Sequence, residues 1–367
     1  MIEVGEYKVA EPDGIETPAM LVFADQLDHN IKAVGELAGG SEHLFVHVKT
    51  HKSIDVTRKQ LASGVAGFKC ATLKELEMVL DAGAQEAILS YPLVQKSKVQ
   101  RFAKLAQREV TVSAIASAPA HVQVLGDVAQ ERQQTLRVMI DLNVGMFRTG
   151  VPLDGAIDLY RQVAQHPHLS PGGLHLYDGH DNLSEPQARQ AAAARHIRDI
   201  QRLKAALEGE GLAVPWVGGG GSFSSLYYAR TEGMYGSPGT CVYWDAGYGS
   251  KMAELPFKWA ALVLTQVVDR YPEHQTLTTD LGTKAISDDG PLATRAKLLQ
   301  NPKAELTRQN EEHGVFAWSG PQPEVGDYLL AVPWHVCPTT IRYPGVHVID
   351  GHGQVADYYL HSARDRA

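Results

Sequence analysis

The stretch Phe45-Val46-His47-Val48-Lys49-Thr50-His51-Lys52-Ser53 decides the predicted fold. Phe45, Val46 and Val48 have the aromatic and β-branched character of a short buried strand, and basic side chains cluster at its end. Like charge and burial both disfavour an ammonium group, so Lys49 is expected to act as a nucleophilic amine that can condense with a carbonyl. The alternative is a solvated basic loop, and spacing alone does not separate the two.

Around this stretch, short apolar strands alternate with amphipathic helices. Strands are expected at residues 19–23, 45–48, 65–70, 87–90, 110–115, 136–141, 173–177 and 214–217, with helices between them. Eight strand–helix units in about two hundred residues fit a (β/α)8 barrel, whose site lies at the C-terminal ends of the strands, where Lys49 is expected. A doubly wound open sheet is the alternative.

Beyond Pro238 the pattern changes to one strand after another. Strands are expected at residues 258–268, 276–279, 315–318, 327–332, 346–349 and 354–360, which indicates an antiparallel β domain. The sequence therefore predicts an α/β protein with a barrel at residues 15–237 and a β domain at residues 238–367, to which residues 1–14 could be added.

Composition narrows the class of partner. The 367 residues are 44% hydrophobic and 21% charged, as in an ordinary globular protein, and the net charge of −8 is spread without blocks. This disfavours nucleic acid and membranes as partners and leaves a small molecule as the expected ligand. Residues 1–10 do not resemble a secretion signal and the three cysteines form no disulfide framework, so a cytoplasmic location is expected.

Gly218-Gly219-Gly220-Gly221-Ser222 follows the last expected barrel strand. A glycine run exposes backbone N–H groups, and barrel enzymes commonly bind phosphate in the loops after the seventh and eighth strands. The run therefore favours a phosphorylated ligand. The alternative is a flexible linker that leaves the barrel.

His335-Val336-Cys337 directly follows a strand of the β domain. On an extended segment, residues two apart point the same way, so the imidazole and thiolate could share one borderline or soft divalent ion. Two ligands make a minimal site. The alternative is a packed histidine beside a buried cysteine.

Several motifs taken together carry a resemblance to a known family. After residues 45–53 come Asp141-Leu142-Asn143-Val144-Gly145-Met146-Phe147-Arg148-Thr149-Gly150, Tyr177-Asp178-Gly179-His180, the glycine run, Pro238-Gly239-Thr240-Cys241-Val242-Tyr243-Trp244-Asp245, Glu311-Glu312-His313-Gly314 and His335-Val336-Cys337. The ordered set resembles the D-threonine aldolase and D-serine dehydratase family. Those are pyridoxal-phosphate enzymes with an alanine-racemase-type barrel and a C-terminal β domain, and the likeness covers nearly the whole chain.

The resemblance implies roles for particular residues. Lys49 would bind pyridoxal phosphate covalently, Arg148 would hydrogen-bond the phenolate oxygen of the cofactor, and Tyr177 would lie against its ring. The phosphate group would be held by Gly220, Gly221, Ser222 and Ser224. A permanent guanidinium cation suits a phenolate, although a surface arginine and a barrel-core tyrosine are the plainer alternatives for Arg148 and Tyr177.

His335 and Cys337 match the metal ligands of the family, and His335 is expected to be catalytic as well. The family carries His-x-Cys in zinc dehydratases and often His-x-Asp in aldolases, so zinc is favoured and manganese stays open. Cys241 and Ala71 stand where many members carry tyrosine and some carry glutamine, which leaves the environment of the cofactor ring open. Further side chains have no firm role: Asp280, Lys284, His313, His51 and His180.

The resemblance implies a lyase that acts on D-3-hydroxy amino acids. D-threonine aldolase activity is favoured because the motifs at Tyr177–His180 and Pro238–Asp245 look more like the aldolase branch. The His-Val-Cys motif keeps a D-serine or D-3-hydroxyaspartate dehydratase as the alternative. A racemase or a non-catalytic pyridoxal-phosphate-binding protein fits less well, and relatives of this fold imply a homodimer.

Overall fold

The computed structural model describes residues 1–366 and divides the chain into two compact units. The barrel unit comprises residues 34–49, 57–239 and 365–366, and the β unit comprises residues 1–33, 50–56 and 240–364. The chain passes from the barrel unit to the β unit at the Lys49–Thr50 peptide bond. Within the described part of the chain, no helix combines the length and apolar character needed to cross a membrane.

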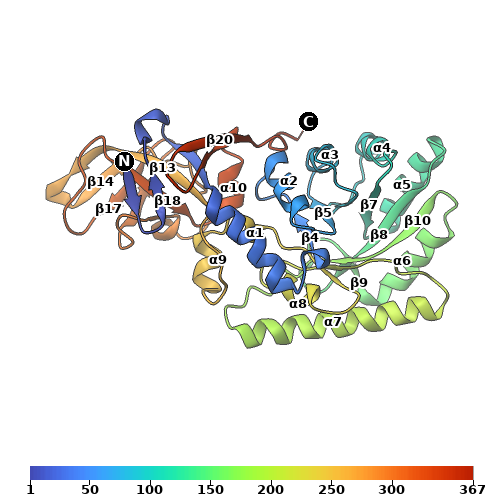
Figure 1. Ribbon diagram of the computed structural model, residues 1–367. Helices are drawn as coiled ribbons and strands as arrows, with labels where there is room; N and C mark the ends of the chain where they lie inside the picture. The colour runs from blue at the N-terminus through green and yellow to red at the C-terminus, as the bar shows by residue number, and fades with distance from the viewer. Residues whose placement is uncertain (367) are drawn as a thin grey trace. The chain divides into compact units, whose positions relative to one another are not determined.

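The barrel unit is built on a parallel sheet (Figure 1). Its strands follow the order β12 (Tyr235–Gly236), β11 (Val217–Gly219), β10 (Leu169–Leu176), β8 (Leu136–Asn143), β7 (Thr111–Ala116), β6 (Glu86–Leu89), β5 (Gly67–Cys70) and β4 (Phe45–His47), with β9 (Val151–Pro152) beside β8. A parallel bridge between Leu44 and Gly236 brings the two edges of the sheet together. The predicted parallel barrel is therefore confirmed, in a nearly closed form.

Helices alternate with these strands. They are α1 (Ala24–Ala38), α2 (Ile54–Ala62), α3 (Leu73–Asp81), α4 (Lys96–Leu105), α5 (Pro119–Glu131), α6 (Leu153–Gln165), α7 (Pro186–Gly209) and α8 (Ser225–Ala229). Thr72 caps the start of α3, because its Oγ1 accepts a hydrogen bond from Glu75 N–H at 3.1 Å, and the Glu75 side chain accepts one from Ala71 N–H at 2.6 Å. This cap fixes the turn that joins β5 to α3.

Two of the predicted barrel strands need correction. Residues 19–23 form a strand, β3 (Ala19–Phe23), but it pairs with strands of the β unit and not with the barrel. The eighth barrel strand is β12, which has only two residues. Hydrophobic periodicity shows that a segment is a buried strand but not which sheet it joins, and a two-residue strand has no periodicity to read.

The barrel interior is layered along its strands. Phe45, Ile88, Ile115, Met139 and Trp216 form a buried apolar cluster. Phe45 is paired with Gly67 across β4 and β5, where a Cβ atom on Gly67 would lie 2.5 Å from the phenyl ring, so only glycine leaves room for it.

One alternation further along the same strands, the interior becomes polar. The cross-strand pairs there are His47 with Lys69 and Asp141 with His175. Because side chains two apart on a strand point to the same face, this polar layer lies next to the apolar cluster, at the C-terminal ends of the strands.

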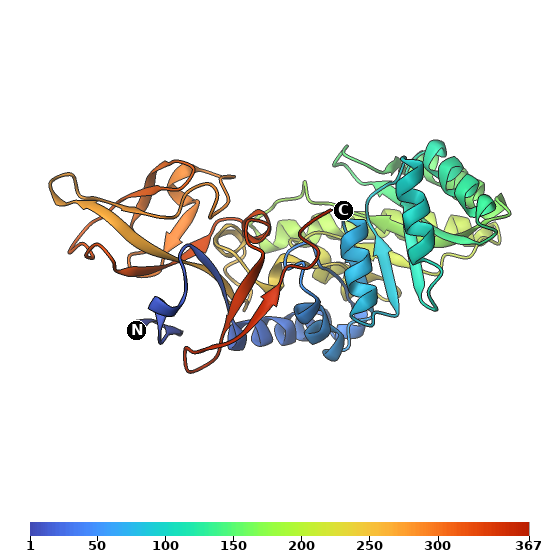
Figure 2. The ribbon, with the colours of Figure 1, turned by 90° about the horizontal axis from the view of Figure 1, so that it is seen from above.

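The β unit contains a second sheet, which is mostly antiparallel. Its main path is β16 (Glu305–Gln309), β17 (Gly314–Ala317), β14 (Thr276–Thr279), β13 (Ala261–Tyr271), β3, β19 (Gly345–Ile349) and β20 (Val355–Leu360). Strand β18 (Tyr328–Pro333) pairs with β13 and β15 (Ala296–Leu298), and β1 (Ile2–Val4) pairs with β2 (Tyr7–Val9). The hairpin of β19 and β20 is drawn in red in Figure 2. Two short helices, α9 (Ala246–Lys251) and α10 (Val336–Thr340), complete the unit.

A buried histidine should make the β unit sensitive to acid. Burial lowers the pKa of His361, which is 4% exposed, to about 4, although its ring bonds the Tyr343 carbonyl oxygen. In the unfolded chain His361 has an ordinary histidine pKa near 6.5. Between about pH 6.5 and pH 4, this residue is therefore protonated in the unfolded chain and neutral in the folded chain. We expect the free energy of unfolding to fall by roughly 2–3 kcal/mol over that range through this residue.

Chemical denaturation at pH 7 and at pH 4.5 measures this effect. A His361→Asn variant keeps an amide nitrogen for the Tyr343 carbonyl but has no group that titrates there. It should show a smaller decrease with pH than the parent chain. An equal decrease in both proteins would assign the acid sensitivity to other groups.

Candidate active site

Lys49 lies two residues after the end of β4, and its side chain is half-buried at the mouth of the barrel unit. Its Nζ atom lies 5.7 Å from the centre of the Tyr177 ring, which follows β10. The guanidinium carbon of Arg148 lies 4.7 Å from the centre of the same ring. The structure therefore brings together three of the predicted site residues, each at the end of a different barrel strand.

The loop after β8 presents Arg148. Asn143 begins the turn, because its side-chain Oδ1 accepts hydrogen bonds from the backbone N–H groups of Gly145 at 3.0 Å and Phe147 at 3.1 Å. Phe147 has a φ of 54°, in the left-handed region. The turn leaves Arg148 exposed to solvent while its guanidinium group contacts Tyr177.

The glycine run begins inside β11 and turns beside Tyr177. Gly219 has a φ of +146°, and a Cβ atom there would lie 1.9 Å from the carbonyl oxygen of Leu176, so only glycine fits. A Cβ atom added to Gly221 would lie 3.3 Å from the Tyr177 ring. The predicted phosphate loop and the predicted cofactor lysine thus meet at one tyrosine.

Asp178 anchors this loop from within. Its carboxylate accepts hydrogen bonds from Gly221 N–H at 3.0 Å, from the Ser224 hydroxyl at 2.6 Å and from the Tyr228 hydroxyl at 2.8 Å. Burial raises the pKa of Tyr228 well above its usual range, and the nearby Asp178 carboxylate adds to the effect, so Tyr228 stays a donor. Two of the predicted phosphate ligands, Gly221 and Ser224, are held in place by these bonds, and Ser222 is half-buried next to them.

The β unit carries the predicted metal residues. His335 occupies the N-cap position of α10 and Cys337 lies in the first turn of that helix, so the segment is not extended as the sequence suggested. Asp289 hydrogen-bonds Nδ1 of His335, and the Thr50 hydroxyl lies 3.2 Å from Cys337 Sγ. Burial lowers the pKa of His335, but Cys337 and Asp289 favour its charged form more strongly and raise the pKa to about 9.

A second cluster that could hold a metal ion lies in the barrel unit. The ligand atoms of His180, Asp181 and His196 all lie within 4.8 Å of one another among the residues that the structure describes. His196 Nε2 is 2.7 Å from an Asp181 oxygen, and a guanidinium nitrogen of Arg195 is 3.9 Å from the same oxygen. The Arg195 cation competes with any ion for that carboxylate.

The other side chains singled out in the sequence have separate surroundings. Asp280 accepts hydrogen bonds from the Thr265 hydroxyl and the Gln266 backbone, Lys284 forms ion pairs with Glu311 and Glu312, and His313 is exposed. His51 is buried and accepts a hydrogen bond from Ser53 N–H, while burial raises the pKa of Cys241 to about 12. Asp280 and Lys284 therefore have partners within the β unit that fit a structural role.

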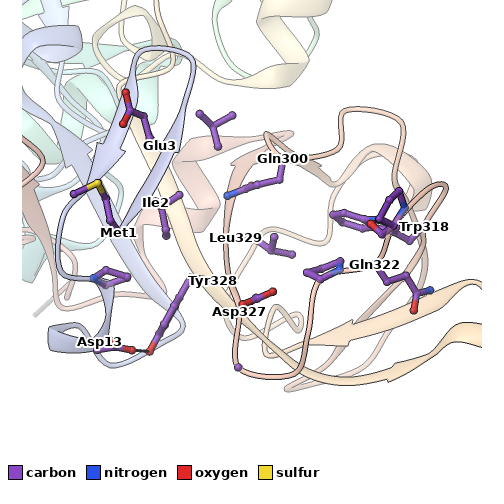
Figure 3. A pocket seen from close by; sticks show the side chains of 15 residues that line it. Met1, Ile2, Glu3, Asp13, Gln300, Trp318, Gln322, Asp327, Tyr328 and Leu329 are labelled. Carbon is purple, nitrogen blue, oxygen red and sulfur yellow. Dashed lines mark hydrogen bonds between the residues drawn. The ribbon is translucent and has the colours of Figure 1, made fainter.

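The β unit also contains a cavity of about 540 Å³ (Figure 3). Acidic, amide and aromatic side chains line it, and Tyr328 donates a hydrogen bond to Asp13 at its edge. None of its lining residues, all in the described chain, is a lysine, arginine, histidine or cysteine. This cavity therefore lacks the groups that a phosphorylated carbonyl compound or a borderline metal ion requires.

Three buried side chains in the polar layer of the barrel interior were not identified as site residues from the sequence. Lys69, Asp141 and His175 are each at most 3% exposed, and His175 Nδ1 lies 2.7 Å from an Asp141 oxygen. The Nζ atom of Lys69 lies 5.9 Å from the centre of the Tyr177 ring. A lysine inside the four-residue buried strand β5 was the signal available in the sequence, since lysine is almost never fully buried without a partner.

A parallel barrel with a lysine and a glycine-rich turn at its C-terminal end is an architecture in which barrel enzymes hold phosphorylated ligands. A family model described as the alanine racemase N-terminal domain matches residues 22–246, which is more than half of the chain. The chain therefore belongs to the alanine racemase N-terminal domain family. A second model, described as a putative serine dehydratase domain, matches residues 260–349.

Individual relatives extend over most of the chain. A 3-hydroxy-D-aspartate aldolase of Paracoccus denitrificans (strain Pd 1222) is 27% identical over 339 residues, which cover 89% of this chain and 86% of that protein. A D-threo-3-hydroxyaspartate dehydratase of Delftia sp. (strain HT23) is 27% identical over 93% of this chain and 96% of its own. The crystal structure of D-threonine aldolase from Filomicrobium marinum has a TM-score of 0.89 and 26% identity, with 99% of each chain covered. The predicted resemblance is confirmed.

Proposed function

We propose that this protein is a lyase that uses pyridoxal phosphate and a divalent metal ion to cleave D-3-hydroxy amino acids, with D-threonine aldolase activity. The observation that carries the proposal is the convergence on Tyr177 of the Lys49 amine, the Arg148 guanidinium group and the glycine run. These are an amine for a carbonyl, a permanent cation for an anionic oxygen, and backbone donors for a phosphate.

The residues present fit pyridoxal phosphate. Lys49 is the residue to which its carbonyl carbon would bind, and Gly220, Gly221, Ser222 and Ser224 would hold the phosphate group. Three basic side chains lie within 5.9 Å of the Tyr177 ring centre, so the pocket suits an anionic molecule with a flat ring. When bound, this cofactor withdraws electrons from the Cα atom of an amino acid and so weakens the bonds there.

The chain's own residues would hold the bound molecule in one orientation. Arg148 provides a charge that does not titrate, and the turn set by Asn143 holds it over Tyr177. Tyr177 supplies a flat face against which a ring can stack, which limits rotation within the pocket. Asp178 keeps the Gly221–Ser224 turn in one conformation by accepting the Gly221 N–H and the Ser224 hydroxyl. A bound phosphate group would take over these two hydrogen bonds from the Asp178 carboxylate.

His335 and Cys337 also fit the proposed metal ion. An imidazole and a thiolate together are ligands suited to zinc and other borderline cations. Asp289 holds Nδ1 of His335, which orients the ring and leaves Nε2 as the ligand atom, an arrangement common behind metal-binding histidines. A divalent ion held there would supply Lewis-acid chemistry toward the β-hydroxyl group of a substrate.

The relatives support aldol cleavage, since two of the three described above are aldolases and one is a dehydratase. Dehydration to a keto acid and ammonia is the second candidate, because Cys337 gives the metal motif the form that resembles the dehydratases. We also propose that the enzyme is a cytoplasmic homodimer, for which size-exclusion chromatography with light scattering is the test of assembly.

Product identity separates the two activities. With added pyridoxal phosphate and Zn²⁺ or Mn²⁺, D-threonine should give glycine and acetaldehyde, with 2-oxobutanoate and ammonia at less than about a tenth of the product. L-threonine should react at least about 100-fold more slowly, because a rigid site orients the β-hydroxyl group of only one enantiomer correctly.

D-3-hydroxyaspartate and D-serine should be assayed in parallel, with amino-acid analysis, aldehyde trapping and ammonia determination on each reaction. Keto acid as the main product from any of these substrates would assign the dehydratase activity. Equal rates with L-threonine would contradict the D configuration.

A further inference from the structure

The cofactor pocket of the barrel unit contains a second lysine. Lys69 lies at the third position of β5, is 3% exposed, and points its Nζ atom to within 5.9 Å of the Tyr177 ring centre. Lys49 reaches the same ring at 5.7 Å. Two amines, one after β4 and one on the neighbouring strand β5, therefore lie near one tyrosine ring, and the proposed function gives a chemical role to only one of them.

Lys69 is buried among groups of both signs. Its surroundings comprise Asp141 and Arg148 from β8 and the loop after it, His175 and Asp178 from β10 and the segment after it, Lys49 after β4, and the Tyr177 ring. Asp141, the carboxylate with the larger charge effect on Lys69, already bonds His175. Burial is the main cause that lowers the pKa of Lys69, and the charges of Lys49 and Arg148 add to it, whereas Asp141 and Asp178 partly oppose it; together they bring the pKa to about 7.

An ammonium group in this position lacks a sufficient counter-charge in the free protein. Pyridoxal phosphate brings a phosphate group and a phenol oxygen, both of which carry negative charge at neutral pH. A nearby anion favours the charged form of an amine, so occupation of the pocket should reverse the balance at Lys69.

We propose that Lys69 is a second functional amine of the cofactor pocket, which takes up one proton from solvent when pyridoxal phosphate binds and then supplies a positive charge inside the barrel. This inference rests on the proposed function, because it takes pyridoxal phosphate as the ligand of Lys49. Lys69 acts through the pocket's charge, which makes it a positioning residue. Its neutral amine gains the proton, and no other bond forms or breaks at it.

Proton uptake on cofactor binding tests the proposal directly. The cofactor-free full-length chain is mixed with pyridoxal phosphate at pH 8 in a weakly buffered solution containing a pH indicator. Two variants provide the comparison: Lys69→Met has a similar length and no charge, and Lys69→Arg has a charge that never titrates. The parent chain should take up close to one proton per site more than either variant, since a group with a pKa near 7 is mostly neutral at pH 8 before binding.

The pH dependence of the visible absorption band of the bound cofactor gives a second readout that does not depend on turnover. A positive charge in the pocket disfavours a second positive charge on the group attached to Lys49. The midpoint of the pH titration of this absorption band should therefore lie about one pH unit or more higher in Lys69→Met than in the parent chain. In Lys69→Arg the titration midpoint should stay close to that of the parent chain. A purely structural lysine would change neither the proton count nor the midpoint.

The two hypotheses fail in different ways. A visible band of normal intensity, with equal proton counts and equal midpoints in the parent chain and Lys69→Met, would contradict the role of Lys69 alone. Absence of any visible band in the parent chain would contradict the proposed function and, with it, the role of Lys69. Circular dichroism and thermal melting show whether a variant is misfolded. If Lys69→Met is misfolded, Lys69→Arg supplies the proton-count comparison.

Discussion

Replacing Lys49 with alanine is expected to remove the cofactor-dependent activity almost completely. The amine of Lys49 is the group proposed to bind pyridoxal phosphate, and no nearby residue can replace both its position and its chemistry. We expect turnover to fall by at least about 10³-fold, in line with losses seen when an essential nucleophile is removed. Steady-state assays with D-threonine, together with the visible spectrum of the purified protein, measure the effect.

Covalent trapping identifies the amine independently of turnover. Borohydride should bleach the visible band of the parent protein, and peptide mapping should find the reduced cofactor on Lys49. Lys52 is the matched control: its side chain belongs to the β unit, where Nζ contacts the Ala363 carbonyl oxygen at 3.5 Å. Lys52→Met should keep the trapped label on Lys49. Recovery of the label on Lys52 or Lys69 would contradict the assignment.

Much of the barrel could be predicted because its strands are apolar and its helices are amphipathic. The segment 45–53 showed a buried strand that ends in basic residues, and Lys49 does lie at the strand end beside Tyr177 and Arg148. Parallel strands bring their C-terminal ends to one edge, so residues that follow separate strands could be grouped without any distance information. Lys49 and the glycine run could be placed in one site in this way, whereas Arg148 and Tyr177 were assigned to it by the family resemblance.

The positions that sequence reasoning missed depend on strand pairing and side-chain direction. β3 has the same composition as a barrel strand, and only its pairing with β13 and β19 assigns it to the other sheet. The burial of Lys69 could not be predicted, because either face of a strand of four residues can be buried. Its pairing with His47 depends on strand register, which is set by tertiary structure.

The proposed metal site shows the same limit. His335 and Cys337 are two residues apart, but the partner of His335, Asp289, lies 46 positions earlier in the chain and has no local signal. The helix that begins at Val336 follows a β-strand and contains Pro338, a residue that commonly occurs in the first turn of a helix. Spacing suggested that the two side chains act together, while the helical turn that holds them was visible only in the structure.

Removal of the metal site proposed at His335 and Cys337 should abolish turnover and leave the proposed cofactor bound. The proposed metal ligands belong to the β unit and the proposed cofactor ligands to the barrel unit, so the two groups have separate donors. We expect Cys337→Ser and His335→Asn to lose at least about 100-fold in activity, because changes even behind the metal ligands commonly cost 10–100-fold. Asp289→Asn should fall within that lower range, since it weakens the hold on Nδ1 of His335 but removes no ligand.

Metal analysis and visible spectroscopy on the same samples make the prediction specific. The parent protein should contain close to one divalent ion per chain, Cys337→Ser should contain far less, and both should show the visible band of bound cofactor. His196→Asn is the control for the second cluster, in which Arg195 lies near the shared Asp181 carboxylate. It should retain metal and activity. If His196→Asn loses the ion while Cys337→Ser keeps it, the metal belongs to the barrel unit and the role proposed for His335 and Cys337 is wrong.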